Sequence, residues 1–395
     1  MTHVPINRRS IAAGALATIA LLVAAGPAQA STTPPDDTQP GAPGPTVVAV
    51  EMTDDGCPAP QAEYPAGAIT FAVENVSAVA VTEFEVLSGD RILGEKENLP
   101  PGFSGDFSLE LGPGTYTLYC PGAATERTDI ELTGEGPADA PTDTAGLLQE
   151  GADGYLGYVQ TQVTEMIDAV AALDEAIGTG DVDASKAAYA NARPFYERIE
   201  PVAESFVVGD VNLDAAIDLR ADDVEPTELT GFHRIEYGLW IDETTEGLDA
   251  VSAQLVADID SLDELVAGLT GFQPAELANG AVGLLDEAAA GKITGEEERY
   301  SRIDILDMAA NIEGAEQAFA YLEPGLSVID ADLVDVIQER FDALDTLVAQ
   351  FEDPEQPSGY VLYTDLTEEQ ITALSDALQA VAEPLSQVAA KVVNA

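Results

Sequence analysis

The stretch Thr230-Gly-Phe-His-Arg-Ile-Glu-Tyr-Gly-Leu-Trp240 carries a histidine and a glutamate three positions apart. His233 is one of two histidines in the chain, and the other, His3, lies close to the N terminus. On a helix, residues at i and i+3 share one face about one turn apart. We therefore expect a helix here, on which His233 and Glu236 can bind one metal ion. The alternative is a core histidine beside a solvated glutamate, because short patterns also match by chance.

The chain on both sides of this stretch, from Leu147 to the C terminus, has helical periodicity. Apolar residues recur at helical spacing over the ranges 155–177, 184–206, 248–269, 274–290, 297–322, 331–351 and 368–393. Thr367, directly before two glutamates, is typical of a helix N-cap. About eight helices joined by short loops predict an antiparallel helical bundle over residues 147–395.

Residues 46–134 have a different pattern, typical of β-strands. Short β-rich runs cover 47–52, 68–73, 82–87, 106–111 and 115–120, and glycine, proline and asparagine clusters separate them. Runs of this length and spacing predict a small antiparallel sandwich. Residues 31–45 are expected to form a flexible tether and residues 135–146 a linker. The predicted fold is therefore multidomain, with an all-β sandwich followed by an all-α bundle.

Residues 1–30 have the features of an export signal. Arg8 and Arg9 precede an apolar run from Ile11 to Ala25, and Ala28-Gln-Ala30 is typical of a cleavage site. The paired arginines leave both the general and the twin-arginine export routes open. No cysteine lies near the cleavage site, so we expect no lipid anchor. The mature protein is expected to be periplasmic or otherwise extracytoplasmic.

The chain is strongly acidic. Its formal net charge is −57, from 72 acidic and 15 basic residues. Such a surface repels nucleic acid and anionic lipid and attracts cations, so no nucleic-acid partner is expected. A hydrophobic content of 46 % is too high for a wholly disordered chain.

Further acidic residues lie near the histidine stretch in the sequence. Pro201 should kink the helix predicted over 184–206, and Glu200 lies at that kink. Asp218 follows in a polar segment that leads back to His233. Farther on, Tyr300, Asp304, Asp307 and Asn311 recur at helical spacing. That stripe can support a metal site, face solvent or form a buried polar seam.

Four stretches of the helical part, taken together, resemble a known family. They are Tyr196-Glu-Arg-Ile-Glu-Pro-Val-Ala-Glu204, Ile217-Asp-Leu-Arg220, Thr230-Gly-Phe-His-Arg-Ile-Glu236 and Ile293-Thr-Gly-Glu-Glu-Glu-Arg-Tyr300. They look like the imelysin-like domain of the EfeO/EfeM iron-uptake proteins. Two stretches of the N-terminal part, Glu97-Asn-Leu-Pro-Pro-Gly-Phe-Ser104 and Gly112-Pro-Gly-Thr-Tyr-Thr-Leu-Tyr-Cys120, resemble the cupredoxin-like domain of EfeO.

This resemblance implies an extracytoplasmic iron-binding component that works with a membrane permease and a haem-containing peroxidase-like partner. It also implies a metal site made from His233 and Glu236, with Glu200 and Asp218 matching the family's further acidic positions. Three carboxylates and one imidazole are hard ligands that suit iron, manganese or zinc more than copper(I). Of these metals the resemblance implies iron, ferric or ferrous, and zinc is a possible surrogate. Without a cation, clustered carboxylates repel and at least one must hold a proton.

Cys57 and Cys120 are the only cysteines of the chain. In an exported protein they are expected to form a disulfide, which would stabilise the fold by about 4 kcal/mol in the chain-entropy model. The alternative is a second metal site with Glu83, and in EfeO relatives the two cysteines are thought to bind copper or iron. No histidine or methionine follows Cys120, so a type 1 copper centre cannot form from this domain alone. Glu83 and Glu85 share one strand face and either bind a cation or face solvent.

Three functions compete. The first, without catalysis, is iron capture outside the membrane for delivery to a permease. The second is a metallopeptidase, since imelysin-like domains have been classed among peptidases; however, the zinc ligand sets of such enzymes need two histidines, and the mature chain has one. The third is a metal oxidase, which needs a redox metal at Cys57 and Cys120.

Overall fold

The N-terminal part of the chain is built from two β-sheets. The computed structural model describes residues 46–81, 83–89, 91–97, 99–134, 143–208, 211–219 and 224–395. One sheet has the order β1 (Thr46–Met52), β3 (Gly67–Asn75), β6 (Ser104–Leu111). The other has the order β2 (Glu63–Pro65), β8 (Arg127–Thr133), β7 (Gly114–Tyr119), β4 (Phe84–Ser88), β5 (Arg91–Lys96). The expected leader over 1–30, the tether over 31–45 and residues 135–142 of the expected linker lie outside the described residues.

Alternating side chains of the two sheets form one apolar core. Val48, Val50 and Met52 of β1 are buried at every second position, as the period of two in a strand requires. Phe71 of β3 stacks on Phe107 of β6, with ring centroids 5.4 Å apart. Most buried apolar residues of both sheets belong to one cluster, so the two sheets pack as a sandwich, while Leu87 of β4 and Ile92 of β5 pack with Val207.

The pairing of the strands differs from the antiparallel prediction. β1 runs parallel to β3, and β2 runs parallel to β8, while the other pairs of the two sheets are antiparallel. The sandwich is therefore mixed. The prediction was wrong on this point because alternation within a strand specifies which face is buried but not which neighbour the strand pairs with.

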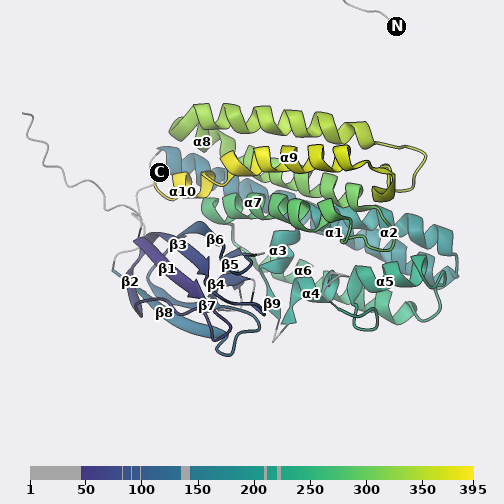
Figure 1. The fold of residues 1–395 in the computed structure, drawn as a ribbon, viewed down its shortest axis with the longest axis horizontal. Coiled ribbons are helices and arrows are strands. Elements are labelled where there is room, and N and C mark those ends of the chain that lie inside the picture. The colour runs from purple at the N-terminus through teal and green to yellow at the C-terminus, as the bar shows by residue number, and fades with distance from the viewer. Residues whose placement is uncertain are drawn as a thin grey trace, which may run out of the picture. The chain divides into compact units, whose positions relative to one another are not determined.

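The described residues from 143 onward form helices, the turns between them and one short ribbon, and Figure 1 shows the long helices lying side by side. The predicted order, β-rich first and helical second, is confirmed. The helices are α1 (Asp143–Thr179), α2 (Val182–Glu197), α3 (Glu200–Glu204), α4 (Leu213–Ile217), α5 (Gly231–Trp240), α6 (Asp249–Gly268), α7 (Pro274–Ala290), α8 (Asp304–Val348), α9 (Glu368–Leu385) and α10 (Val388–Val392). Three 3₁₀ turns, η1 (Lys292–Thr294), η2 (Ala349–Phe351) and η3 (Tyr363–Asp365), and the ribbon β9 (Val207–Val208) and β10 (Val211–Asn212) complete this part. α1 starts inside the segment expected to be a linker.

Two of the predicted helices are interrupted where the site lies. The helix predicted over 184–206 ends at Glu197 and resumes as α3 at Glu200, because Pro201 cannot donate a backbone hydrogen bond to the carbonyl of Glu197. Asn311 of α8 supplies that hydrogen bond, with its Nδ2 2.8 Å from the Glu197 oxygen. The helix predicted to begin at Glu297 begins at Asp304 instead, and Glu297 lies in a run of turns.

Among the described residues, every helix is too short or too polar to cross a membrane.

Candidate metal centre

The helix that carries His233 is fixed against the end of α4 by a glycine. Gly231, the first residue of α5, has φ +50°, and a Cβ there would lie 1.7 Å from the carbonyl oxygen of Ile217. Only glycine permits both this backbone conformation and this close approach. Thr230 adds a second link by donating from Oγ1 to the carbonyl of Ala215 at 2.7 Å. The two contacts bring His233 next to Asp218, the residue that ends α4.

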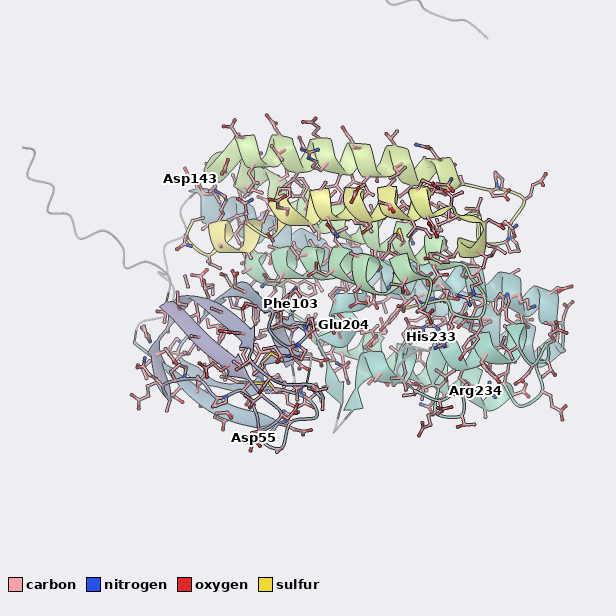
Figure 2. All side chains as sticks on the ribbon, viewed as in Figure 1. Asp55, Phe103, Asp143, Glu204, His233 and Arg234 are labelled. Atoms are coloured by element: carbon pink, nitrogen blue, oxygen red, sulfur yellow. A yellow bond between two sulfur atoms is a disulfide. The ribbon has the colours of Figure 1, made fainter. Side chains whose placement is uncertain are left out.

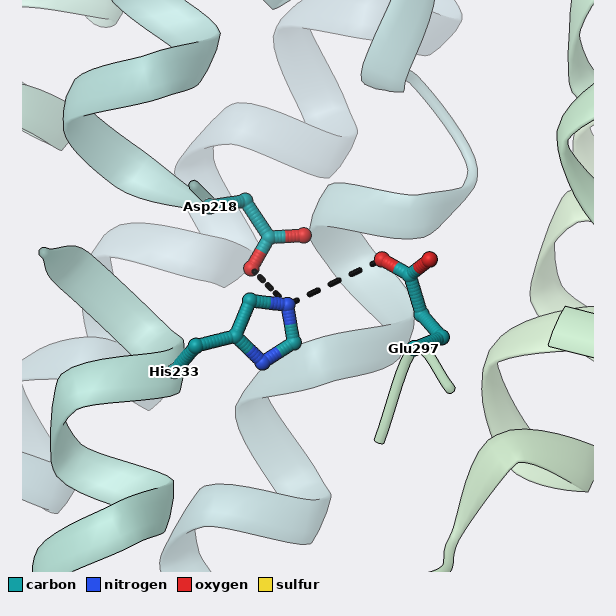
Figure 3. A group of neighbouring side chains, drawn as sticks. All are labelled: Asp218, His233 and Glu297. Carbon is teal, nitrogen blue, oxygen red and sulfur yellow. Dashed lines mark ion pairs between the residues drawn. The ribbon is translucent and has the colours of Figure 1, made fainter. Parts of the chain in front are cut away.

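His233 faces two carboxylates with its Nε2 atom (Figure 3). Asp218 Oδ1 lies 3.4 Å from Nε2 and Glu297 Oε1 lies 3.7 Å from it. All three residues are buried, with exposed fractions of 2 % or less. Donors bonded to one metal at about 2.1 Å lie roughly 3 to 3.5 Å apart, so this spacing is close to that of a coordinated ion. The three residues come from the end of α4, from α5 and from the turns before α8.

Glu236 lies on the other side of the imidazole. Its Oε2 is 3.2 Å from Nδ1 of His233, and its Oε1 accepts the backbone N–H groups of Tyr300 at 2.7 Å and Ser301 at 2.6 Å. A carboxylate on one ring nitrogen fixes the ring and directs the other nitrogen toward a metal. Glu236 also holds the turns that carry Glu297. Glu236 therefore positions both His233 and Glu297.

Arg193 of α2 neutralises part of this charge and is fully buried. It forms ion pairs with Asp218 and Glu197, with Glu298 at 3.0 Å and with Asp307 at 2.9 Å. The side chain that links these four carboxylates also lies over the ring of Phe232, 5.0 Å from its centroid. A guanidinium held in this way is a fixed part of the site.

Lys292 of η1 is the second buried cation. Its Nζ lies 3.1 Å from Glu197, 3.4 Å from Glu200 and 3.9 Å from Glu297. Burial lowers the pKa of Lys292, but Glu197, Glu200 and Glu297 outweigh burial and hold the pKa well above its ordinary value. Glu200 is thus connected to the histidine side of the site through Lys292 and Glu297.

Negative charge is in excess throughout the cluster. Among the described residues it contains nine buried carboxylates and three cationic side chains: Glu197, Glu200, Asp218, Glu236, Glu287, Glu297, Glu298, Asp304 and Asp307, with Arg193, His233 and Lys292. Burial raises the pKa of Glu200, Glu298 and Asp307 well above their ordinary values. Burial also lowers the pKa of His233, but Asp218, Glu236 and Glu297 outweigh it and raise the pKa well above its ordinary value. Protons or an added cation must therefore balance the surplus charge.

Known proteins provide an independent comparison. The imelysin family model matches residues 151–388, which include every residue of this cluster. The protein named "Iron uptake system component EfeO" from Escherichia coli (strain K12) is 36 % identical over 346 residues, covering 86 % of this chain and 90 % of the relative. Proteins of the same name from Shigella flexneri and Escherichia coli O157:H7 match to the same extent.

The chain belongs to the EfeO family. The resemblance drawn from the sequence motifs is thereby confirmed. The name of the matching family model also includes the word peptidase, but a name does not show peptidase activity in this chain.

Within this EfeO-family chain, the four metal-site residues predicted from the sequence do not all face the same side of the imidazole. His233 and Asp218 face each other, Glu236 takes the far ring nitrogen, and Glu200 lies beyond Lys292. Figure 2 labels His233 and Arg234, consecutive residues of α5, and His233 is the buried one. The sequence interpretation did not name Glu297, Arg193 or Lys292 as site residues. Glu297 lies within the stretch Ile293–Tyr300 that carried the resemblance, and this was the only signal for it.

The second predicted site lies in the β-rich part of this EfeO-family chain, where the structure shows a disulfide and a buried glutamate. Cys57 and Cys120 form a disulfide, with Cα atoms 6.3 Å apart, so neither offers a thiolate. Glu85 is not solvent-facing: it is 1 % exposed and lies directly opposite Glu95 across β4 and β5. Burial, with Glu95 and Glu83 adding to it, raises the pKa of Glu85 to about 11.

Proposed function

We propose that the protein binds iron between His233, Asp218 and Glu297 and serves as the extracytoplasmic iron-binding component of an iron uptake system. The observation that carries this proposal is the Nε2 side of His233, where two carboxylates lie 3.4 Å and 3.7 Å away inside a cluster rich in negative charge. The names of the relatives, which describe iron uptake system components, support the choice of metal.

The donor set suits iron on chemical grounds. Carboxylate oxygens and a neutral imidazole are ligands for ferric and ferrous iron, whereas copper(I) prefers thiolate or thioether donors. The ring must lose its Nε2 proton before it can coordinate, so binding releases protons. We assign the first contacts to His233, Asp218 and Glu297, the orientation of the ring to Glu236, and a place beside Lys292 to Glu200.

We infer the wider role from the resemblance to the family. An export signal over residues 1–30 would place the mature protein outside the cytoplasmic membrane, where it passes iron to a membrane permease with the help of a haem-containing peroxidase-like partner. In this proposal residues 46–134 form a cupredoxin-like domain and residues 147–395 the imelysin-like domain that carries the iron. The cysteine pair acts as a structural link, and the cargo binds in the helical part.

Two alternative functions lack support. Zinc peptidases need two histidine ligands, and His233 is the only histidine of the chain outside the proposed export signal over residues 1–30. Glu236, which a peptidase would need as a base facing water, accepts two backbone N–H groups instead. A metal oxidase at Cys57 and Cys120 would need free thiolates, and the two residues are paired. We therefore propose a binding role without catalysis.

The substitution Asp218→Asn tests the proposal. It keeps the shape of the side chain and removes one anionic donor, so the affinity for ferric ion supplied as its nitrilotriacetate complex should fall about tenfold or more. Isothermal titration measures this, with the melting temperature of each variant as a check of folding.

The matched control is Asp330→Asn, which removes a carboxylate that pairs with Lys391 at 2.6 Å outside the cluster. Its affinity for iron should equal that of the wild type. Equal affinities in all three proteins, or no binding of ferric ion by the wild type, would contradict the proposed function.

A further inference from the structure

Lys292 has an unusual position for an ammonium group. Its side chain is fully buried, although lysine is almost never buried without a partner. η1, which begins at Lys292 directly after Gly291, places the residue at the end of α7. Burying an ammonium is strongly unfavourable unless anionic partners compensate for the loss of water. Here Glu197, Glu200 and Glu297 provide that compensation.

The same carboxylate oxygen serves both Lys292 and His233. Glu297 Oε1 lies 3.9 Å from Nζ of Lys292 and 3.7 Å from Nε2 of His233. A cation bound between His233 and Glu297 would therefore be a close neighbour of the ammonium. Two like charges at such a distance repel strongly in a buried site. The Lys292 ammonium in its present position therefore disfavours the binding of a cation between His233 and Glu297.

Lysine and arginine differ in their ability to move. Arg193 is held by four carboxylates and by the ring of Phe232, so its guanidinium is fixed. Lys292 holds its charge on a flexible four-carbon stem, and two of its three contacts are 3.4 Å or longer. Of the two, Lys292 is the cation that can withdraw when another cation arrives.

We propose that the Lys292 ammonium is a resident competitor for the iron that the proposed function assigns to this site. It stabilises the empty cluster by standing in for the missing positive charge. It withdraws from Glu297 when iron binds, and it returns when iron leaves. Its role is to lower the affinity and speed release, so that the cargo can be passed on. This inference rests on the proposed function and concerns a positioning residue, not a ligand.

The substitution Lys292→Met tests the inference, because methionine has a similar length and no charge. Removal of a competitor should raise the affinity for ferric nitrilotriacetate about tenfold and slow the transfer of iron to a chelator by a similar factor. Removal of the counter-charge should lower the melting temperature of the metal-free protein. A purely structural lysine would lower the melting temperature without raising the affinity, and a lysine that helps to place ligands would lower both.

Lys391→Met is the matched control, since it removes an ammonium that pairs with Asp330 away from the cluster. It should leave affinity and release unchanged. If Lys292→Met does not fold, the pair Glu200→Gln and Lys292→Met/Glu200→Gln replaces the comparison, because the double change removes one charge of each sign. The double variant should then bind iron more tightly than Glu200→Gln alone.

The possible failures are distinguishable. If the wild type does not bind ferric ion, the proposed function and this inference both fall. If the wild type binds it and loss of the ammonium leaves the affinity equal or weaker, the proposed function stands and the competitor role is overturned.

Discussion

The two ring nitrogens of His233 face different groups. Nδ1 faces Glu236 at 3.2 Å, and Nε2 faces Asp218 and Glu297. The sequence placed His233 and Glu236 one turn apart on a helix, and that helix is confirmed. Spacing along a helix could not reveal which ring nitrogen the glutamate would face, because the rotation of the ring depends on groups from other parts of the chain. The backbone N–H groups of Tyr300 and Ser301 hold Glu236 in place.

The other groups of the cluster were hard to predict for a related reason. Arg193 and Lys292 belong to stretches whose pattern gives no sign that a charge is buried there. Whether a charged residue is exposed or buried depends on partners far away in the sequence. In the case of Arg193 these partners include Asp218 and Asp307.

At the residue scale, Asp304 predicts a pH dependence of stability. Burial raises its pKa from 3.8 to about 7. Between these two values the unfolded chain releases a proton that the folded chain keeps, so rising pH favours unfolding. The stability that the protonated side chain provides is fully present below pH 3.8 and is lost as the pH rises through 7. Asp304→Asn should therefore match the wild type near pH 4 and exceed it near pH 8, by on the order of 4 kcal/mol.

Denaturant unfolding of metal-free wild type and Asp304→Asn across this pH range measures the difference. Asp330→Asn is the control, because the hydrogen bond from Lys391 lowers the pKa of Asp330. In that case the stabilisation is present above the unfolded pKa and is lost as the pH falls, so the variant should not gain stability near pH 8. A wild type and an Asp304→Asn variant whose curves stay parallel would contradict the assignment.

At the scale of the elements, the breaks between helices determine the site. The sequence predicted a kink at Pro201, and the structure has a full break there, between α2 and α3. It did not predict that residues 297–303 would be turns, because glutamate-rich stretches favour helix. Glu236 overrides this preference by taking the N–H groups of Tyr300 and Ser301. Tertiary contacts of this kind leave no trace in local periodicity.

The junction of α4 and α5 gives a second prediction, at Gly231. Alanine there would require φ near +50° and would place a Cβ 1.7 Å from the Ile217 carbonyl oxygen. The backbone must shift, and His233 must move away from Asp218. Gly231→Ala should lower the free energy of unfolding by several times the roughly 1 kcal/mol of a left-handed alanine. It should also weaken the binding of ferric ion, measured by titration.

Gly180→Ala isolates the conformational part of this effect. Gly180 has φ +80° and no atom near the position of an added Cβ. This variant should lose about 1 kcal/mol of stability and keep its affinity for iron. Similar losses in the two variants, with iron binding intact in both, would show that the close contact at Gly231 does not position the histidine.

At the scale of the whole molecule, composition and order along the chain were informative. The change from strand to helical periodicity predicted the β-rich part and the helical part in their order, which is confirmed. The parallel pairing of β1 with β3 and of β2 with β8 could not be predicted, because pairing is decided by contacts between distant segments. The excess of acidic residues indicated a preference for cations, but not that nine carboxylates would be buried together.

The position of the ion in crystals of the protein soaked with iron tests the central claim most directly. Anomalous diffraction at the iron absorption edge locates the metal without assumptions about its ligands. We predict a peak within bonding distance of His233 Nε2 that also contacts Asp218 and Glu297. A peak elsewhere in the chain, with the Nε2 side of His233 left without iron, would contradict it.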